Sequence, residues 1–272
     1  MQHTHTQQLE QTAKDLRLMV TEMLYASGSG HWGSSLGTAD IFSVLFFGGV
    51  LRHSRLHAKR AQMDRFILSC GHICPIYYAC LIKAGYLGDK KVTLRKLGSP
   101  LQGHPSHSFW DAIETSTGPL GQGVGVAVGK ALALRLTKSK SRVFCMTSDG
   151  EHEEGSTWEA VAAAGKHALS SLVFILDRNH MQISGTTEEV SNLGDIATRY
   201  ETLGWRVLMV DGNSVSRLLT VFEKAQTRSS KPTLVLCTTV MGKGVPFIEN
   251  NYHYHGKAPN NDEYTRALSF LK

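Results

Sequence analysis

Short apolar runs alternate with helical patterns along most of this chain of 272 residues. Each run lacks the alternation of a half-exposed strand, which is typical of strands buried on both faces of a parallel sheet. The predicted strands are Arg65–Ser69, Val143–Thr147, Leu172–Leu176, Trp205–Val210 and Thr233–Thr238.

Apolar residues at helical spacing fill the intervals, and the predicted helices cover residues 8–26, 73–86, 124–136 and 214–228, with others after 38 and 155. Strands that alternate with helices predict an α/β fold, a doubly wound and mostly parallel sheet with helices on both faces. Such a sheet binds its ligand at the carboxyl ends of the strands. We find no internal repeat or linker and predict a single domain over residues 1–272.

Oxygen-bearing side chains end two of the predicted strands. Asp149 and Gly150 follow the run at 143–147, and Asp177 and Asn179 end the next run. In a right-handed strand–helix–strand unit these two ends lie side by side. Asp149 and Asn179 can therefore face one ion, and their hard oxygen atoms suit octahedral Mg²⁺ with positions left for phosphate oxygens. Gly150 lets a phosphate group approach the backbone.

Three histidines, His31, His72 and His104, each follow a glycine. His31 stands in a predicted loop between two helices, directly after the break at 27–30. A histidine in such a loop either caps a helix or serves as an active-site imidazole that donates to anions and shuttles protons. We favour the second interpretation because all three histidines share the same setting.

A glycine-rich turn at 117–123 leads into the helix predicted at 124–136, which is rich in small residues. The free N–H groups of a helix N-terminus bind anions. The small residues are equally typical of a helix that packs closely against a neighbour, and both interpretations can hold.

Together these motifs resemble those of the transketolase family of thiamine diphosphate enzymes. The Asp-Gly pair, its downstream Asn and the Glu-Gly-Ser-Thr-Trp-Glu-Ala segment at 154–160 are similar to the family's diphosphate-binding motif. The Gly-His segments, Thr-Gly-Pro-Leu-Gly-Gln-Gly at 117–123 and His-Gly-Lys at 255–257 extend the resemblance from about residue 12 to the end of the chain. The sequence departs from the family pattern at Trp32, Ser148 and Met241, where relatives have Pro, Gly and in some cases Lys.

The resemblance implies that the chain binds thiamine diphosphate and Mg²⁺, for which Ca²⁺ or Mn²⁺ can substitute. The implied metal ligands are Asp149, Asn179 and the carbonyl of Met181. The implied cofactor contacts are Ser34, His72, Gly118, Leu120, Asp149, Gly150, Glu154, Asn179, Ile183 and His255. The implied catalytic residues, which hold substrate hydroxyls and move protons, are His31, His104 and His255.

Only the diphosphate-binding (PP) half of a transketolase is covered by this resemblance. We therefore expect the pyrimidine-binding and C-terminal domains on a separate chain, and interpret this one as the N-terminal subunit of a split transketolase that is active only with its partner. The implied reaction transfers a two-carbon ketol unit from a ketose phosphate to an aldose phosphate in the pentose phosphate pathway. An α2β2 assembly follows, in which Glu154 and Glu159 lie between like subunits unless they are ordinary surface carboxylates.

Three alternatives remain at this stage. The nearest is another thiamine diphosphate enzyme, either a specialised sugar transketolase or a 1-deoxyxylulose-phosphate synthase type. A second is a non-catalytic binder of thiamine diphosphate, which the intact ligand and histidine sets disfavour. A third is a dinucleotide-binding oxidoreductase, which the glycine spacing at 121–125 disfavours because no apolar strand precedes it.

Composition adds modest constraints. The net charge is +6, but basic residues form no cluster, even in the densest stretches at 52–65 and 83–96. This argues against nucleic-acid binding and suits anionic, phosphorylated substrates. The 5 cysteines lack paired short spacings and are interpreted as reduced thiols. Because the chain shows neither a signal peptide nor an apolar run of about 20 residues, we expect no membrane segment and a cytoplasmic location.

Overall fold

The computed structural model describes residues 2–54, 62–88 and 93–272, so parts of both basic stretches, 55–61 and 89–92, lie outside the described residues. Its centre is a five-stranded, fully parallel sheet. In spatial order the strands are β1 (Arg65–Leu68), β2 (Val143–Ser148), β3 (Leu172–Arg178), β7 (Thr233–Thr238) and β6 (Arg206–Asp211). The predicted α/β fold with its mostly parallel sheet is confirmed, and each predicted strand agrees within two residues.

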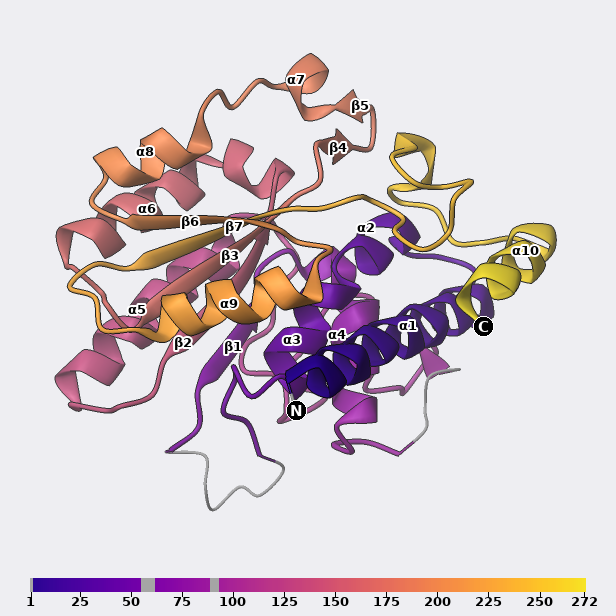
Figure 1. Ribbon diagram of the computed structural model, residues 1–272, viewed down its shortest axis with the longest axis horizontal. Coiled ribbons are helices and arrows are strands. Elements are labelled where there is room, and N and C mark those ends of the chain that lie inside the picture. The colour runs from indigo at the N-terminus through magenta and orange to yellow at the C-terminus, as the bar shows by residue number, and fades with distance from the viewer. Residues whose placement is uncertain (1, 55–61, 89–92) are drawn as a thin grey trace.

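Helices cover both faces of this sheet (Figure 1). One face is covered by α3 (Ala39–Phe47), α4 (Cys74–Lys83) and α9 (Val215–Gln226), and α1 (Gln2–Ser27) packs against these helices. The other face packs against α5 (Gln122–Leu136), α6 (Gly155–Lys166) and α8 (Ile196–Thr202).

The side chains of alternate strand residues point into two separate hydrophobic cores. In β2, Phe144 and Met146 point into the core of the first face, whereas Val143 and Cys145 point into the second. All six residues of β2 are buried, which explains its unbroken apolar sequence. Each fully buried large apolar side chain contributes roughly 1.5–3 kcal/mol, so the two cores dominate the stability of the fold.

The strand registers bring polar residues together at the carboxyl edge of the sheet. Ser148 of β2 is level with Asp177 of β3, which in turn is level with Cys237 of β7. The residues that follow β2 and β3 therefore emerge next to each other, as expected from the strand ends in the sequence.

Short elements gather beyond that edge (Figure 1). They are α2 (Trp32–Gly37), the 3₁₀ turns η2 (Gly71–Ile73), η4 (Gly150–Glu153) and η5 (Tyr252–Tyr254), and the hairpin of β4 (Met181–Gln182) and β5 (Gly185–Thr186) with α7 (Thr187–Val190) after it. The loop predicted between the first two helices is corrected, because α2 occupies most of it and His31 stands directly before its first residue.

Two glycines explain how this helix fits there. A Cβ atom at Gly33 would lie 2.9 Å from the Met241 Cγ, and one at Gly37 would lie 2.8 Å from the Val240 carbonyl oxygen. Residues without side chains thus let α2 lie directly on the segment that follows β7. This contact depends on residues about 200 positions away and could not be seen in the local pattern.

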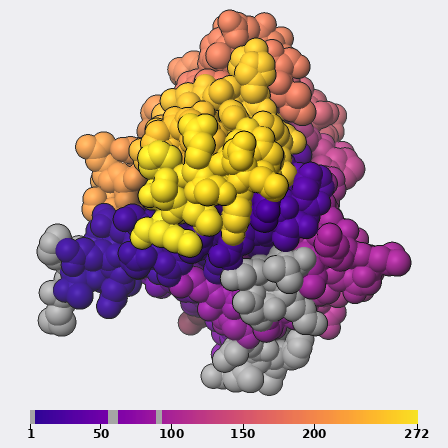
Figure 2. All heavy atoms as spheres, turned by 90° about the vertical axis from the view of Figure 1, so that its right-hand side faces the viewer, coloured from indigo at the N-terminus to yellow at the C-terminus, as the bar shows by residue number. Residues whose placement is uncertain are grey.

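The C-terminal helix α10 (Asn261–Leu271) packs on α1, so the first and last helices of the chain lie side by side (Figure 2). The rings of Tyr25 and Tyr264 stack there with centroids 4.0 Å apart. Within the described ranges, none of the helices combines the length and apolar character needed to cross a membrane.

Candidate functional site

A cavity of about 300 Å³ opens at the carboxyl edge of the sheet. Its wall combines residues from the ends of β2 and β3, the β4–β5 hairpin, α2, η2 and the turn before α5. The lining residues are Ser34, His72, Leu120, Ser148, Asp149, Gly150, Asn179, Met181, Gln182, Ile183, Ser184 and His255. The structure thus brings together most of the residues singled out in the sequence.

Asp149 directly follows β2 and is only 1% exposed. Its Oδ2 accepts a hydrogen bond of 2.7 Å from the backbone N–H of His180. Its Oδ1 lies 3.2 Å from Nη1 of Arg178 but has no hydrogen-bond partner among the described residues. Burial raises the pKa of Asp149 to about 7, although the Arg178 cation acts in the opposite direction.

Asn179 is held in one orientation by its neighbours. Its Nδ2 donates to Oδ2 of Asp177 at 2.8 Å, and its Oδ1 accepts from the Met181 N–H at 2.9 Å. Asp177 also accepts a hydrogen bond from Thr239. Because the amide N–H of Asn179 donates to Asp177, its amide oxygen points towards the chain that enters β4, where this oxygen can serve as a metal ligand.

Three imidazole rings pack together beside these oxygen atoms. The ring centroids of His31 and His72 are 4.7 Å apart, those of His31 and His255 are 5.7 Å apart, and those of His72 and His255 are 6.0 Å apart. Burial lowers the pKa of His31 and of His255 to about 4, and holds the pKa of His72 well below its usual value. All three rings are therefore neutral at pH 7, when each can donate one hydrogen bond and accept another.

Among the described ring contacts none joins His104 to this group, although its charge contributes to the lowered pKa of His31 and of His72. His104 is exposed and does not line the cavity, but its ring packs on the turn before α5, since a Cβ at Gly118 would lie 3.4 Å from its Cγ. Partial burial, and then the positive charge of Arg95, lower the pKa of His104.

Of the described residues predicted to contact a cofactor, Gly118 and Glu154 are not part of the cavity wall. Gly118 stands behind it, between His104 and the turn at Gly71. Glu154 and Glu159 are both exposed, at the start and on the outer face of α6. Their predicted place between two like subunits stays a prediction.

Some contributors were not found in the sequence. Gln182 and Ser184 line the cavity from the β4–β5 hairpin, whose polar sequence resembles any surface turn. Glu151 is fully buried behind the cavity, and its Oε1 accepts hydrogen bonds from Ser69 Oγ at 2.5 Å and the Gly121 N–H at 2.9 Å. Burial raises the pKa of Glu151 to about 7. In the sequence, only the position of Glu151 two residues after Asp149 could have indicated a role at this site.

Unpaired polar atoms mark this edge of the sheet. Among the described residues, the buried side-chain atoms without a hydrogen-bond partner are His31 Nδ1, Ser34 Oγ, Ser35 Oγ, Asp149 Oδ1, Glu151 Oε2 and His255 Nδ1. Nearly all buried polar groups in proteins are paired, so a cluster of exceptions points to a ligand that supplies the partners. The arrangement combines acidic and amide oxygens for a hard cation with neutral imidazoles for an anion or a hydroxyl.

Side chains alone do not form a complete metal site. No group of three or more His, Cys, Asp or Glu residues in the described part of the chain could hold a metal ion. Of the predicted ligands, only Asp149 belongs to these residue types, because Asn179 would use its amide oxygen and Met181 its carbonyl. The remaining positions of an octahedral ion would have to come from water or a bound phosphate.

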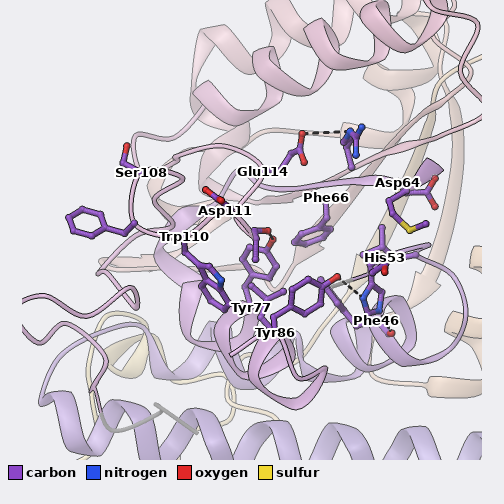
Figure 3. Close-up of a pocket in the computed structure, with 17 residues that line it drawn as sticks. Phe46, His53, Asp64, Phe66, Tyr77, Tyr86, Ser108, Trp110, Asp111 and Glu114 are labelled. Carbon is purple, nitrogen blue, oxygen red and sulfur yellow. Dashed lines mark hydrogen bonds and ion pairs between the residues drawn. The ribbon is translucent and has the colours of Figure 1, made fainter. Parts of the chain in front are cut away.

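A larger cavity, about 440 Å³, lies at the opposite edge of the sheet, before β1 (Figure 3). Its wall includes an aromatic cluster in which Phe46, Phe66 and Tyr77 are in mutual contact. Two of the three carboxylates in its wall already have cationic partners, since Asp64 binds Arg52 at 2.7 Å and Glu114 binds Lys130 at 2.7 Å, and the third, Asp111, is exposed. The smaller cavity therefore carries the chemistry.

Comparison with known proteins agrees with this geometry. Residues 8–270 match the family described as "Transketolase, thiamine diphosphate binding domain". A transketolase structure from Campylobacter jejuni superimposes with a TM-score of 0.91 at 32% sequence identity, over 97% of this chain and 43% of that one. The chain therefore belongs to the transketolase family, in which it corresponds to the thiamine diphosphate-binding domain.

Two curated relatives differ in how much of them is matched. Mouse transketolase is 39% identical over 255 residues, which are 92% of this chain but 40% of that protein. A protein of Phocaeicola vulgatus, named as one of the subunits of an apulose-4-phosphate transketolase, is 34% identical over 261 residues, 96% of this chain and 92% of that protein. This chain thus spans less than half of the mouse protein and nearly all of the bacterial one.

Proposed function

We propose that this chain is the N-terminal subunit of a split transketolase and that it binds thiamine diphosphate and Mg²⁺ in the cavity at the carboxyl edge. The observation that carries the proposal is the Oδ1 of the buried Asp149, which accepts no hydrogen bond from the described residues, together with the oriented amide of Asn179. A divalent cation would satisfy both oxygens and offset the cost of burying the carboxylate.

The donor set fits this cofactor. Asp149, Asn179 and the carbonyl of Met181 would hold Mg²⁺, or Ca²⁺ or Mn²⁺ in its place. Ser34, His72 and Gly150 would face the diphosphate; a Cβ at Gly150 would meet no atom within 4 Å, so the backbone there is open to a phosphate. The other cofactor contacts would come from Gly118, Leu120, Glu154, Ile183 and His255. When bound, thiamine diphosphate supplies the nucleophilic carbon that cleaves a bond next to a ketone.

His31, His104 and His255 would act on the substrate. The buried His31 and His255 are neutral near pH 7, so each can accept a proton from a sugar hydroxyl at one nitrogen while donating from the other. Their rings meet nearly at right angles, at an interplanar angle of 86°, which directs their nitrogens towards different substrate atoms.

The active enzyme would require a second polypeptide with the pyrimidine-binding and C-terminal domains. The match over 92% of a relative that is itself named as one of several subunits supports this division. We further propose an α2β2 assembly in which α5 and the carboxylates Glu154 and Glu159 contact a second copy of this chain. The exposed Gly125 and Gly129 on α5 leave room for close packing in that contact.

The proposed substrates are sugar phosphates, with a ketol unit passing from a ketose phosphate to an aldose phosphate as in the pentose phosphate pathway. A transketolase from Pichia stipitis, whose structure contains sedoheptulose 7-phosphate, matches this chain with a TM-score of 0.88 at 30% identity. A specialised sugar transketolase is the second candidate, because the relative from Phocaeicola is named for apulose 4-phosphate. A 1-deoxyxylulose-phosphate synthase type is the remaining thiamine diphosphate alternative.

The test is ketol transfer from xylulose 5-phosphate to ribose 5-phosphate, measured with Mg²⁺ and thiamine diphosphate. It is run on the chain alone and on the complex that the chain captures from its own cells. Activity in the complex and none in the chain alone is the expected result. If the complex holds thiamine diphosphate but is inactive, the proposed cofactor site stands and the two proposed sugar phosphates are excluded as substrates. Failure to bind the cofactor in either form would contradict the proposal.

A further inference from the structure

Glu151 is a carboxylic acid in an unusual place. Its residue is 0% exposed, it stands behind the cavity rather than in its wall, and one of its oxygens, Oε2, has no partner in the described chain. A buried carboxyl with a free oxygen is costly, and the apolar second core already provides the packing in this region. Packing alone therefore does not explain a carboxyl group at this position.

The other oxygen, Oε1, joins two segments that are distant in sequence. It accepts from the Ser69 hydroxyl at 2.5 Å and from the Gly121 N–H at 2.9 Å. Ser69 directly follows β1 and leads into η2, which carries His72. Gly121 directly precedes α5 and follows Leu120. His72 and Leu120 both line the cavity, so each contact lies immediately behind one piece of the wall.

Glu151 itself continues a third piece of that wall. Asp149 and Gly150 line the cavity and precede it in the chain. The main chain of Glu151 is fixed as well, because its carbonyl accepts a hydrogen bond of 2.6 Å from Thr157 at the start of α6. The side chain of Glu151 therefore contacts the segments that carry His72 and Leu120, and its main chain continues the segment that carries Asp149.

The turn that Glu151 holds is tightly enclosed. Gly121 has a φ of 76°, a conformation that favours glycine, and a Cβ there would lie 2.9 Å from the Glu154 Cβ. On its other side the turn meets η2, where a Cβ at Gly71 would lie 3.0 Å from Thr117 Oγ1. A change of a few tenths of an ångström at Gly121 would thus reach Leu120 and His72 together.

We propose that Glu151 is a positioning residue that joins the three segments of the cofactor cavity and sets the distance between Asp149, His72 and Leu120. The expected effect on cofactor affinity rests on the proposed function, because the joined segments are those assigned to thiamine diphosphate. Supporting residues behind a metal or cofactor site change its affinity about 10- to 100-fold when they are replaced.

Two replacements separate the hydrogen bonds from the volume. Glu151→Gln keeps a carbonyl oxygen where Oε1 stands, whereas Glu151→Met keeps a similar length and removes the acceptor. The first measurement is hydrogen exchange of the chain alone, which needs no cofactor. In Glu151→Met, we expect amides at 117–123 to exchange at least about tenfold faster, and in Glu151→Gln to remain near the wild-type rate. Unchanged exchange in Glu151→Met would overturn the proposal.

The second measurement is the Kd for Mg²⁺–thiamine diphosphate of the assembled complex. We expect a rise of at least about tenfold for Glu151→Met and recovery in Glu151→Gln. Asp64→Ala, a buried carboxylate at the opposite edge, controls for lost stability and leaves this Kd unchanged. Faster exchange with an unchanged Kd would reduce Glu151 to a structural residue and overturn the positioning role.

Two outcomes of these experiments need a separate interpretation. If Glu151→Met does not fold, Ser69→Ala is the alternative variant, because it removes one of the two donors to Glu151. Faster amide exchange at 69–73 in Ser69→Ala would support the proposal, and unchanged exchange would contradict it. If the wild type does not bind thiamine diphosphate, the proposed function fails, and the exchange rates still decide whether Glu151 joins these segments.

Discussion

Two aspartates at opposite edges of the same sheet, Asp64 and Asp149, are both buried but have different surroundings. Asp64, before β1, is 8% exposed and accepts four hydrogen bonds: three from Arg52, at 2.7, 3.0 and 3.2 Å, and one of 2.8 Å from the Arg142 N–H. Asp149, after β2, accepts one hydrogen bond from a backbone N–H, and burial raises its pKa to about 7.

The difference separates a structural carboxylate from one suited to a ligand. The four donors around Asp64 already compensate for its burial, so nothing further is needed there. Asp149 has only one hydrogen bond and the Arg178 cation 3.2 Å from its Oδ1, which accepts no hydrogen bond, and the residue lines the cavity where neutral imidazoles also gather. Cavity size is no guide here, because the cavity beside Asp64 is larger than the one beside Asp149. Unpaired buried atoms are thus the better guide to the site in this protein.

The largest effect is expected from Asp149→Ala. Removing the only carboxylate among the proposed metal ligands should weaken Mg²⁺-dependent binding of thiamine diphosphate at least about 100-fold, beyond the range for supporting residues. Calorimetry of the assembled complex with and without Mg²⁺ measures this. Retained affinity would refute the metal assignment and remove the contrast with Asp64.

The matched change, Asp64→Ala, should act on stability. It leaves the Arg52 cation and two backbone N–H groups without their acceptor, which should lower the free energy of unfolding by about 2–3 kcal/mol because Arg52 is half exposed. Denaturant unfolding measures the loss, and the cofactor Kd of the folded protein should not change. An altered Kd would show that the two edges are coupled.

The histidines beside Asp149 give a pH-dependent prediction. The pKa of His255 falls to about 4 on folding because of burial, so the unfolded chain binds its proton more strongly, and stability is lost as pH falls from about 6.5 through 4. The difference in unfolding free energy between wild type and His255→Asn should change by about 2 kcal/mol between pH 7.5 and pH 5. Denaturant curves at both pH values test this. The exposed His253 provides the control, and His253→Asn should show no such change.

A third carboxylate tests whether burial is the decisive property. Glu154 is exposed at the same edge as Asp149, so Glu154→Ala should leave the unfolding free energy within about 0.5 kcal/mol of wild type. If it lies between like subunits, the dissociation constant of the assembly should rise severalfold, as measured by analytical ultracentrifugation. Unchanged assembly and cofactor affinity would remove Glu154 from the proposed interface.

Local pattern was sufficient for the sheet and for the polar residues at strand ends. Asp149 and Asn179 could be placed together because parallel strands end at one edge, a rule that needs no knowledge of side-chain packing. The helix α2 and the junction at Glu151 could not be predicted, since the first depends on the segment after β7 and the second on donors at Ser69 and Gly121. The single domain, the α2β2 assembly and the cytoplasmic location stay predictions.

The span of the cavity wall, from Ser34 to His255, has a consequence for synthesis of the protein. His255 must emerge from the ribosome before it can reach His31 and His72, although the earlier strands can pair before that. The nascent chain therefore passes through a stage with a formed sheet and an open cofactor site. A ligand that needs every part of this wall can stabilise the chain only after His255 has emerged.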